Sequence, residues 1–244
     1  MRRLVFTHIQ KAAGNSVNTF FEVIKNQCGA NVLALAGAAS AHAKHSLLPN
    51  LGDIDHDDFD IITGHIPFQV ARDYFAPATF VTVLRDPVER LLSDFCSQPQ
   101  LRTLPDNGLS KLPDLLAVGE FAIDNLQVRM LCDNPRFTEK VTPAMLDEAL
   151  HNLRSFYSLV GFVDRLDAFL ADLSRVYGMP LPDHAWPRLN VTPAYLDKVS
   201  EEHRALVARH NELDAALFEW ANAQSFIPPA PMAKRDTPGR KVMV

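Results

Sequence analysis

The stretch Leu4-Val-Phe-Thr-His-Ile-Gln-Lys-Ala-Ala-Gly-Asn-Ser-Val17 decides the fold of this chain. It opens with an apolar run of strand length, residues 4–9. It ends in an amphipathic segment in which Val17, Phe20 and Ile24 recur at helical spacing. The Lys-Ala-Ala-Gly turn between them has no bulky side chain after its lysine. The stretch therefore predicts a strand, a tight loop and a helix.

A strand, a small-residue loop and a helix N-terminus can together bind an anion. The first backbone N–H groups of a helix have no partner within the helix and point toward the preceding loop. Ala12, Ala13 and Gly14 would let an anion approach these amides, while Lys11 adds a positive charge and Ser16 a hydroxyl group. We expect a phosphate or sulfate to bind here. The alternative is an ordinary strand–turn–helix unit with a solvated lysine.

The loop differs from the two commonest nucleotide-binding loops. A Walker A loop places its lysine directly after the last glycine, whereas Lys11 precedes Gly14. A dinucleotide-binding loop needs three spaced glycines, and this loop has a single one.

Composition limits the class of protein. The 244 residues suffice for one sizeable α/β domain or two small ones, and the apolar content of 47% supports a real core. The net charge of −5 argues against nonspecific nucleic-acid binding as a main role. The three cysteines form no CxxC pair, which fits a reducing compartment and no zinc site. No window reaches the length of a membrane span.

Strands and helices alternate along the chain, which predicts an α/β fold with a parallel sheet and helices on both faces. Further strands are expected at residues 59–63, 79–84 and 157–163, and helices at 15–28, from 87 onward, and at 120–131, 142–156, 166–177 and 200–226. Residues 29–52 and 99–113 are expected to be loops, the second a long surface loop. We predict a single domain at 1–227 and a disordered tail at 228–244. The basic residues of the tail could touch an acidic glycan, but a solvated tail is the favoured interpretation.

Three of the predicted strands are followed by residues with useful chemistry: Lys11, His65 and Arg85. In open parallel sheets, ligands bind beyond the carboxyl ends of the strands. We therefore expect these three side chains to meet in one crevice.

Two segments resemble the carbohydrate sulfotransferases related to heparan sulfate 2-O-sulfotransferase. Residues 8–16 resemble the His-Ile-Pro-Lys-Thr-Gly/Ala-Gly-Thr-Ser loop that holds the 5′-phosphosulfate of 3′-phosphoadenosine 5′-phosphosulfate (PAPS), although Gln10, Ala12 and Asn15 depart from that pattern. Residues 80–93 resemble the second signature, in which an arginine and a serine eight residues later bind the 3′-phosphate.

Arg85 and Ser93 match that second signature without a gap. A guanidinium suits this role because it can make two parallel hydrogen bonds to a phosphate. The alternative is that Arg85 pairs at the surface with Asp86 or Glu89.

The Gly-His segment after the second predicted strand also resembles this family, whose histidine there is the proposed general base. Imidazole suits the role because its pKa lies near working pH. His65 would be that base, and a buried, hydrogen-bonded histidine is the alternative. His8 lies on the strand and is assigned a structural role. Residues 125–129 resemble a family helix near the acceptor site.

The resemblance implies a P-loop-like fold, PAPS as the donor, no metal, and an acceptor hydroxyl that is expected to belong to a glycan. Lys11 would stabilise the leaving group and His65 would deprotonate the acceptor. The implied donor contacts are Lys11, Ala12, Ala13, Gly14, Asn15, Ser16, Arg85, Ser93 and, in a loop closing over the nucleotide, Asn190 and Thr192.

Two further expectations concern location and rival classes. Animal members of the family are anchored in the Golgi by an N-terminal helix that this chain lacks, so we expect a soluble, cytoplasmic and bacterial enzyme. One rival is a P-loop kinase-like phosphotransferase, which usually has a carboxylate after a neighbouring strand for Mg²⁺. Here Asp60 begins the second strand and His65 follows it, which is the wrong order. The other rival is a noncatalytic nucleotide-binding protein.

Overall fold

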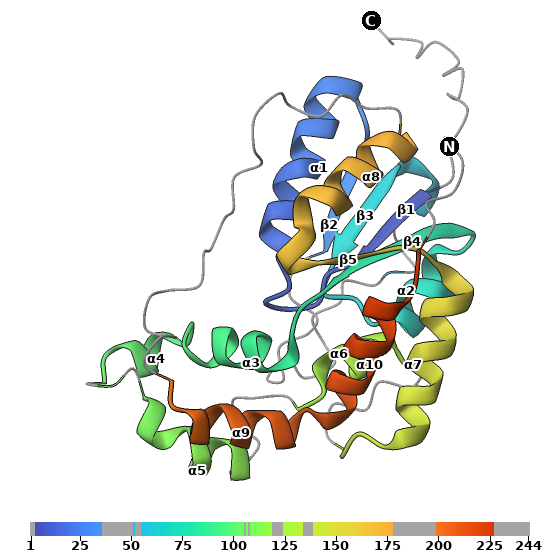
Figure 1. Cartoon of the computed structure of the whole chain (residues 1–244). Coiled ribbons are helices and arrows are strands. Elements are labelled where there is room, and N and C mark those ends of the chain that lie inside the picture. The colour runs from blue at the N-terminus through green and yellow to red at the C-terminus, as the bar shows by residue number, and fades with distance from the viewer. Residues whose placement is uncertain are drawn as a thin grey trace, which may run out of the picture.

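The centre of the molecule is a five-stranded sheet with the order β2-β3-β1-β4-β5, in which every neighbouring pair is parallel (Figure 1). The computed structural model describes residues 3–35, 51, 55–104, 106, 108–118, 124–133, 139–177 and 199–226. The strands are β1 (Arg3–Thr7), β2 (Val32–Leu35), β3 (Ile61–Gly64), β4 (Ala78–Leu84) and β5 (Tyr157–Phe162). This arrangement confirms the predicted parallel α/β fold.

The central position belongs to β1, which pairs with β3 on one side and β4 on the other. The register pairs Thr7 with Gly64 and with Thr82, so the three strands end at the same edge. The loops after β1, β3 and β4 therefore begin side by side, as the strand-end argument requires.

The sequence did not predict β2, which lies where a loop was expected. It pairs in parallel with β3, from Val32 opposite Ile61 to Leu35 opposite Gly64. This edge strand has one neighbour and is partly exposed. Its four residues, Val-Leu-Ala-Leu, are apolar, but the run is short and lies in an Ala- and Leu-rich segment without a clear period, so the sequence did not separate it from a loop.

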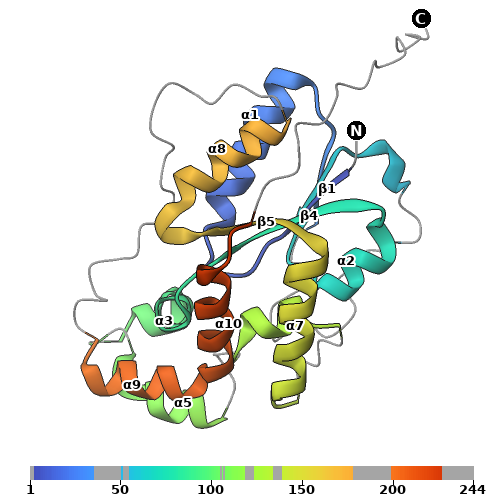
Figure 2. The same cartoon turned by 45° about the vertical axis from the view of Figure 1, so that its right-hand side comes forward.

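Helices cover both faces of the sheet (Figures 1 and 2). One face is covered by α1 (Gly14–Cys28) and α8 (Leu166–Tyr177), and the other by α2 (Phe68–Phe75), α6 (Leu126–Leu131), α7 (Pro143–Phe156) and α10 (Glu212–Ala223). The first layer buries Leu4, Phe6, Val81, Val83, Phe20, Phe21 and Phe169. The second buries Val5, Phe80, Leu84, Tyr157, Phe68, Leu153 and Leu217. Neighbouring residues on β1 and β4 thus face opposite layers.

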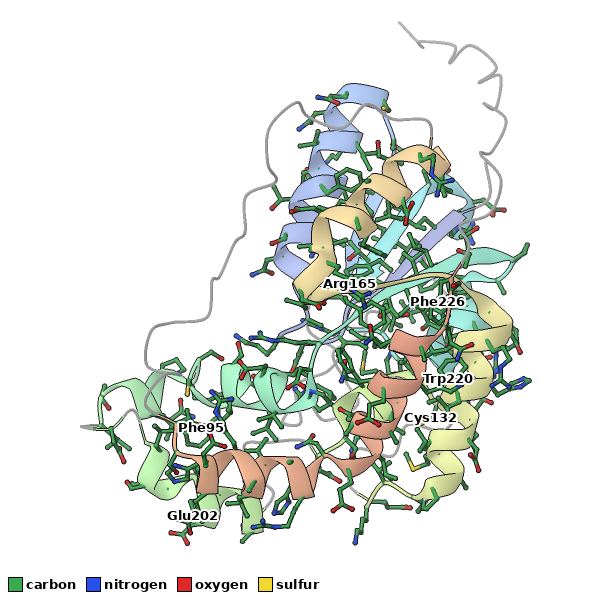
Figure 3. The ribbon with its side chains drawn as sticks, in the orientation of Figure 1. Phe95, Cys132, Arg165, Glu202, Trp220 and Phe226 are labelled. Carbon is green, nitrogen blue, oxygen red and sulfur yellow. The ribbon has the colours of Figure 1, made fainter. Side chains whose placement is uncertain are left out.

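A third apolar cluster lies beyond the sheet, among α3 (Pro87–Phe95), α4 (Pro99–Arg102), η3 (Leu109–Lys111), α5 (Leu112–Val118) and α9 (Glu201–His210). Leu101, Leu109 and Leu112 are buried there against Phe95, which Figure 3 labels at this end of the molecule. The prediction of a long surface loop at 99–113 is therefore wrong. Its leucines recur between prolines and glycines too irregularly to show a helical period.

Two helix boundaries also differ from the sequence prediction. The expected helix at 200–226 is broken into α9 and α10 at Asn211, which has φ −128° and ψ 32°. Its buried side chain accepts a hydrogen bond from the Asn125 amide at 3.0 Å and donates one to the Val207 carbonyl at 2.9 Å. These contacts hold the break. Within the expected helix at 120–131, Asn125 is in the left-handed region, so α6 begins at Leu126.

Candidate active site

The loop after β1 leads directly into α1. Lys11 and Ala13 have φ values of 65° and 58°, a conformation that costs a non-glycine residue about 1–2 kcal/mol. The Ala12 amide donates to the Ile9 carbonyl at 3.2 Å, and its methyl group is buried in the core. The loop thus bends sharply while its lysine stays partly exposed. Strained backbone of this kind concentrates at functional sites.

The start of α1 supplies the amides expected for an anion. The Val17 amide donates to the Ala13 carbonyl at 3.2 Å, so the amides of Gly14, Asn15 and Ser16 come before the intrahelical ladder. Asn15 is exposed, whereas the Ser16 side chain is buried in this structure. The helix end therefore offers backbone donors and the positive end of its dipole.

Gly14 has a second use that the sequence did not indicate. A Cβ atom at this position would lie 1.6 Å from Nε2 of His8. The glycine therefore leaves room for the imidazole ring. The His8 ring also stacks on Phe6, with centroids 5.7 Å apart, and approaches the His65 ring to 4.0 Å.

His65 follows β3, and its orientation is fixed by His8. Nδ1 of His65 lies 2.7 Å from the His8 carbonyl oxygen. A carbonyl can only accept, so Nδ1 carries the proton and the neutral ring has its lone pair on Nε2. Burial lowers the pKa of His65, against the opposing effects of the His8 carbonyl and Asp94. The ring is therefore neutral at pH 7 and can accept a proton at Nε2.

Arg85 follows β4 and reaches the loop after β1. Its Nη1 donates to the Lys11 carbonyl at 3.1 Å, which joins the two predicted anion contacts directly. Its Nη2 lies 3.9 Å from Glu89, whose carboxylate also accepts from Arg204 at 2.7 Å. The long contact to Glu89 is the surface pairing considered from the sequence. Burial lowers the pKa of the Arg85 guanidinium.

Ser93 lies on α3, the helix that begins two residues after Arg85. This helix starts as its sequence predicts: Pro87 is its first residue, and the Asp86 side chain accepts from the Glu89 amide at 2.9 Å. The Ser93 side chain is 8% exposed, so it lies at the inner face of α3.

One carboxylate near the site escaped the sequence analysis. Burial raises the pKa of Asp94, while Coulombic interactions with Arg90, Lys11 and His65 lower it. Asp94 thus interacts electrostatically with Lys11 and His65, the two residues predicted to be catalytic. The sequence around it shows only an amphipathic helix, in which a carboxylate is expected to face solvent, so no signal could have found it.

The predicted residues thus fall into three groups. Hydrogen bonds connect Lys11 with Arg85, and His65 with His8, at one edge of the sheet. Ala12, Ala13, Gly14, Asn15 and Ser16 form the adjoining turn and helix start, and Ser93 lies on the neighbouring helix. Asn190 and Thr192 lie outside the described residues, as does the tail at 228–244. Among the described residues, no group of three or more His, Cys, Asp or Glu side chains is arranged to hold a metal ion.

Comparison with known proteins relates the chain by its fold. No protein-family model matches the sequence, and no curated protein does. The fold is similar to that of the mouse sulfotransferase SULT7A1 complexed with PAP, with a TM-score of 0.50 and 9% sequence identity. The similarity covers 91% of this chain and 89% of the mouse chain. In the part that the structure describes, no helix combines the length and apolar character needed to cross a membrane. The predicted P-loop-like α/β fold is thus confirmed, and it is similar to the fold of this mouse sulfotransferase.

Proposed function

We propose that this protein is a sulfotransferase that moves a sulfuryl group from PAPS to an acceptor hydroxyl. The observation that carries the proposal is the meeting of three strand ends. The loop after β1, the histidine after β3 and the arginine after β4 lie at one edge of the sheet, joined by the Arg85–Lys11 and His65–His8 hydrogen bonds. The mouse sulfotransferase of the same fold was solved with PAP, which supports a PAPS donor.

The residues present fit a donor with two anionic ends. The amides at the start of α1 and the Lys11 ammonium suit the phosphosulfate group. The Arg85 guanidinium and the Ser93 hydroxyl suit the 3′-phosphate. Because Arg85 donates to the Lys11 carbonyl at 3.1 Å, the two subsites adjoin each other. The loop residues Asn190 and Thr192 are proposed as further nucleotide contacts.

The chemistry assigned to the chain needs one base and one cation. The donor supplies an activated sulfuryl group. Nε2 of His65 takes the proton of the acceptor hydroxyl as the acceptor oxygen bonds to sulfur. The bond between sulfur and the bridging phosphate oxygen breaks, and Lys11 stabilises the negative charge that this oxygen gains. The products are a sulfate ester and 3′,5′-adenosine bisphosphate.

The finer assignments rest on the sequence resemblance. We propose a glycan as the acceptor class, a cytoplasmic location, and one domain over residues 1–227. Lys11 and Arg85 are both positively charged, so an acceptor with anionic groups near its hydroxyl would be attracted to the site.

Calorimetry tests the donor assignment. The wild type should bind 3′,5′-adenosine bisphosphate more tightly than 5′-AMP by about 10- to 150-fold, because one charge-assisted contact is worth about 1.5–3 kcal/mol. Arg85→Ala should remove most of this preference. A control variant, Arg175→Ala, alters an exposed arginine paired with Asp172 on α8 and should preserve it.

An activity assay, taken together with the calorimetry, separates this proposal from a kinase-like phosphotransferase. Release of the bisphosphate from PAPS, followed with a panel of sugar and alkyl alcohols, should continue in EDTA. Equal affinity for the bisphosphate and 5′-AMP, or an absolute Mg²⁺ requirement, would overturn the proposal in favour of phosphoryl transfer.

A further inference from the structure

Gln127, on α6, holds the backbone of Arg85 at two points. The Arg85 amide donates to Oε1 of Gln127 at 3.0 Å, and Nε2 of Gln127 donates to the Arg85 carbonyl at 2.9 Å. β4 ends at Leu84, so this side-chain amide continues the ladder for one more residue. Gln127 is fully buried. Both backbone groups of Arg85 are thereby fixed, and with them the direction in which its side chain leaves the chain.

Gln127 is itself held by the start of α10. The amides of Gln127 and Val128 donate to the two carboxylate oxygens of Asp214, at 3.0 and 2.8 Å. In return, Oδ1 of Asn125 accepts from the amides of Leu213 and Asp214, at 3.0 and 2.9 Å. Each helix therefore caps the N-terminus of the other, and Figure 1 shows α6 and α10 side by side. Such a fully bonded buried network is rigid.

A continuous set of hydrogen bonds leads from α10 to the loop after β1. It runs from Asp214 to the backbone of Gln127, from the Gln127 side chain to the backbone of Arg85, and from the Arg85 guanidinium to the Lys11 carbonyl. An arginine binds a phosphate well only when its planar guanidinium is held at the right angle. Gln127 therefore restrains the orientation of the Arg85 side chain, although the two residues are 42 positions apart in the sequence.

We propose that Gln127 is a positioning residue for donor recognition. Its amide fixes the Arg85 backbone so that the guanidinium can contact the Lys11 carbonyl and the 3′-phosphate of the donor together. This inference rests on the proposed function, because it takes Arg85 as the 3′-phosphate contact. The sequence resemblance had associated residues 125–129 with the acceptor side, whereas this hydrogen bonding assigns Gln127 to the donor side.

Gln127→Met tests the proposal, because methionine has a similar length and can neither donate nor accept a strong hydrogen bond. The readout is the ratio of affinities for 3′,5′-adenosine bisphosphate and 5′-AMP, measured by calorimetry beside thermal unfolding. We expect this ratio to fall between about three- and thirtyfold, while the affinity for 5′-AMP changes by less than about twofold. In an Arg85→Ala background, Gln127→Met should leave the ratio unchanged, because its effect passes through Arg85.

Asn152→Leu is the matched control. Asn152 is also fully buried, and its Nδ2 donates to the Leu131 carbonyl at 2.9 Å, at the other end of α6. It should lower the melting temperature and leave the affinity ratio as in the wild type. Gln127→Asn is a second variant in case Gln127→Met does not fold. It keeps a polar amide but is too short to reach both backbone groups, so its ratio should also fall.

Two outcomes would overturn the inference. A folded Gln127 variant with the wild-type ratio, destabilised only as Asn152→Leu is, would show that Gln127 has a purely structural role and would leave the donor assignment intact. A wild-type ratio near one would overturn the donor assignment, and the positioning role would fall with it. The wild-type measurement alone separates these two results.

Discussion

Replacing Gly14 with alanine tests the close packing of the loop after β1 against His8. The new Cβ would lie 1.6, 1.9 and 2.2 Å from three atoms of the His8 ring, well inside contact distance. The ring has little freedom to turn away, because it is 9% exposed and lies against Phe6 and His65. We therefore expect Gly14→Ala to force the ring out of its place.

The size of the effect follows from two opposing contributions. Overpacking of a buried site costs about 1–3 kcal/mol, and three overlapping ring atoms point to the upper end. Alanine in place of glycine within a helix returns about 0.5–1 kcal/mol. The net loss of unfolding free energy should be about 2 kcal/mol, which lowers the melting temperature by roughly 4–8 °C in a chain of this size.

Urea unfolding of four proteins checks this reasoning: the wild type, Gly14→Ala, His8→Ala and the double variant. Without the ring, alanine at position 14 has room, so Gly14→Ala in the His8→Ala background should be neutral or stabilising. Gly29→Ala is the control, because nothing lies within 4 Å of its Cβ position and its φ of +67° alone should cost about 1–2 kcal/mol. Wild-type stability of Gly14→Ala, or an equal cost in both backgrounds, would refute the close approach.

Lys11→Ala is expected to abolish sulfuryl transfer and to weaken bisphosphate binding in calorimetry, and wild-type turnover would contradict its role. His65→Ala should bind the bisphosphate nearly normally yet lose about a hundredfold or more in rate, whereas a joint loss of binding and rate would make the residue structural. Because burial lowers the pKa of His65 from 6.5, the acid limb of the rate–pH profile should lie below pH 6.5, and a limb above it would count against this base. Burial, with a smaller effect of His65, lowers the pKa of His8 to about 3, so the unfolded state binds a proton that the folded state does not. The unfolding free energy should therefore fall from pH 6.5 toward pH 3, by at most about 1.4 kcal/mol per pH unit from this group, and a His8→Phe variant with an equally steep fall in urea titrations would exclude it as the cause.

Local sequence signals predicted the parts of the fold that depend on neighbouring residues. The apolar runs of β1, β4 and β5 are buried on both faces, so they read as strands without any tertiary information. Asp86 with Pro87, and Thr142 with Pro143, begin α3 and α7 through caps made within one turn. The placement of Lys11, His65 and Arg85 at one edge followed from the parallel sheet alone.

Signals that depend on distant packing were absent from the sequence. β2 is a strand because it pairs with β3 at the edge of the sheet, whereas its four apolar residues fit a loop or a short helix equally well. Leu101, Leu109 and Leu112 are buried because α3 and α9 present a matching apolar surface. Their spacing alone suggested a loop.

The hydrogen bonds that hold Arg85 in the candidate site also depend on residues distant in sequence, so the sequence did not predict them. The proposed anion contacts are recognisable because each set lies within one short segment: Lys11 precedes the start of α1, and Arg85 precedes Ser93 by eight residues. The groups that orient Arg85 need only reach its backbone, which Gln127 does from a sequence separation of 42 residues. Asp214 reaches the backbone of Gln127 from a separation of 87. At both positions the residue type fits an exposed helix face equally well. A motif search on this chain therefore finds the residues proposed to contact the donor and misses those proposed to orient them. Measuring how variants of Gln127 and Asp214 change the Arg85 contact is the way to detect their part in donor binding.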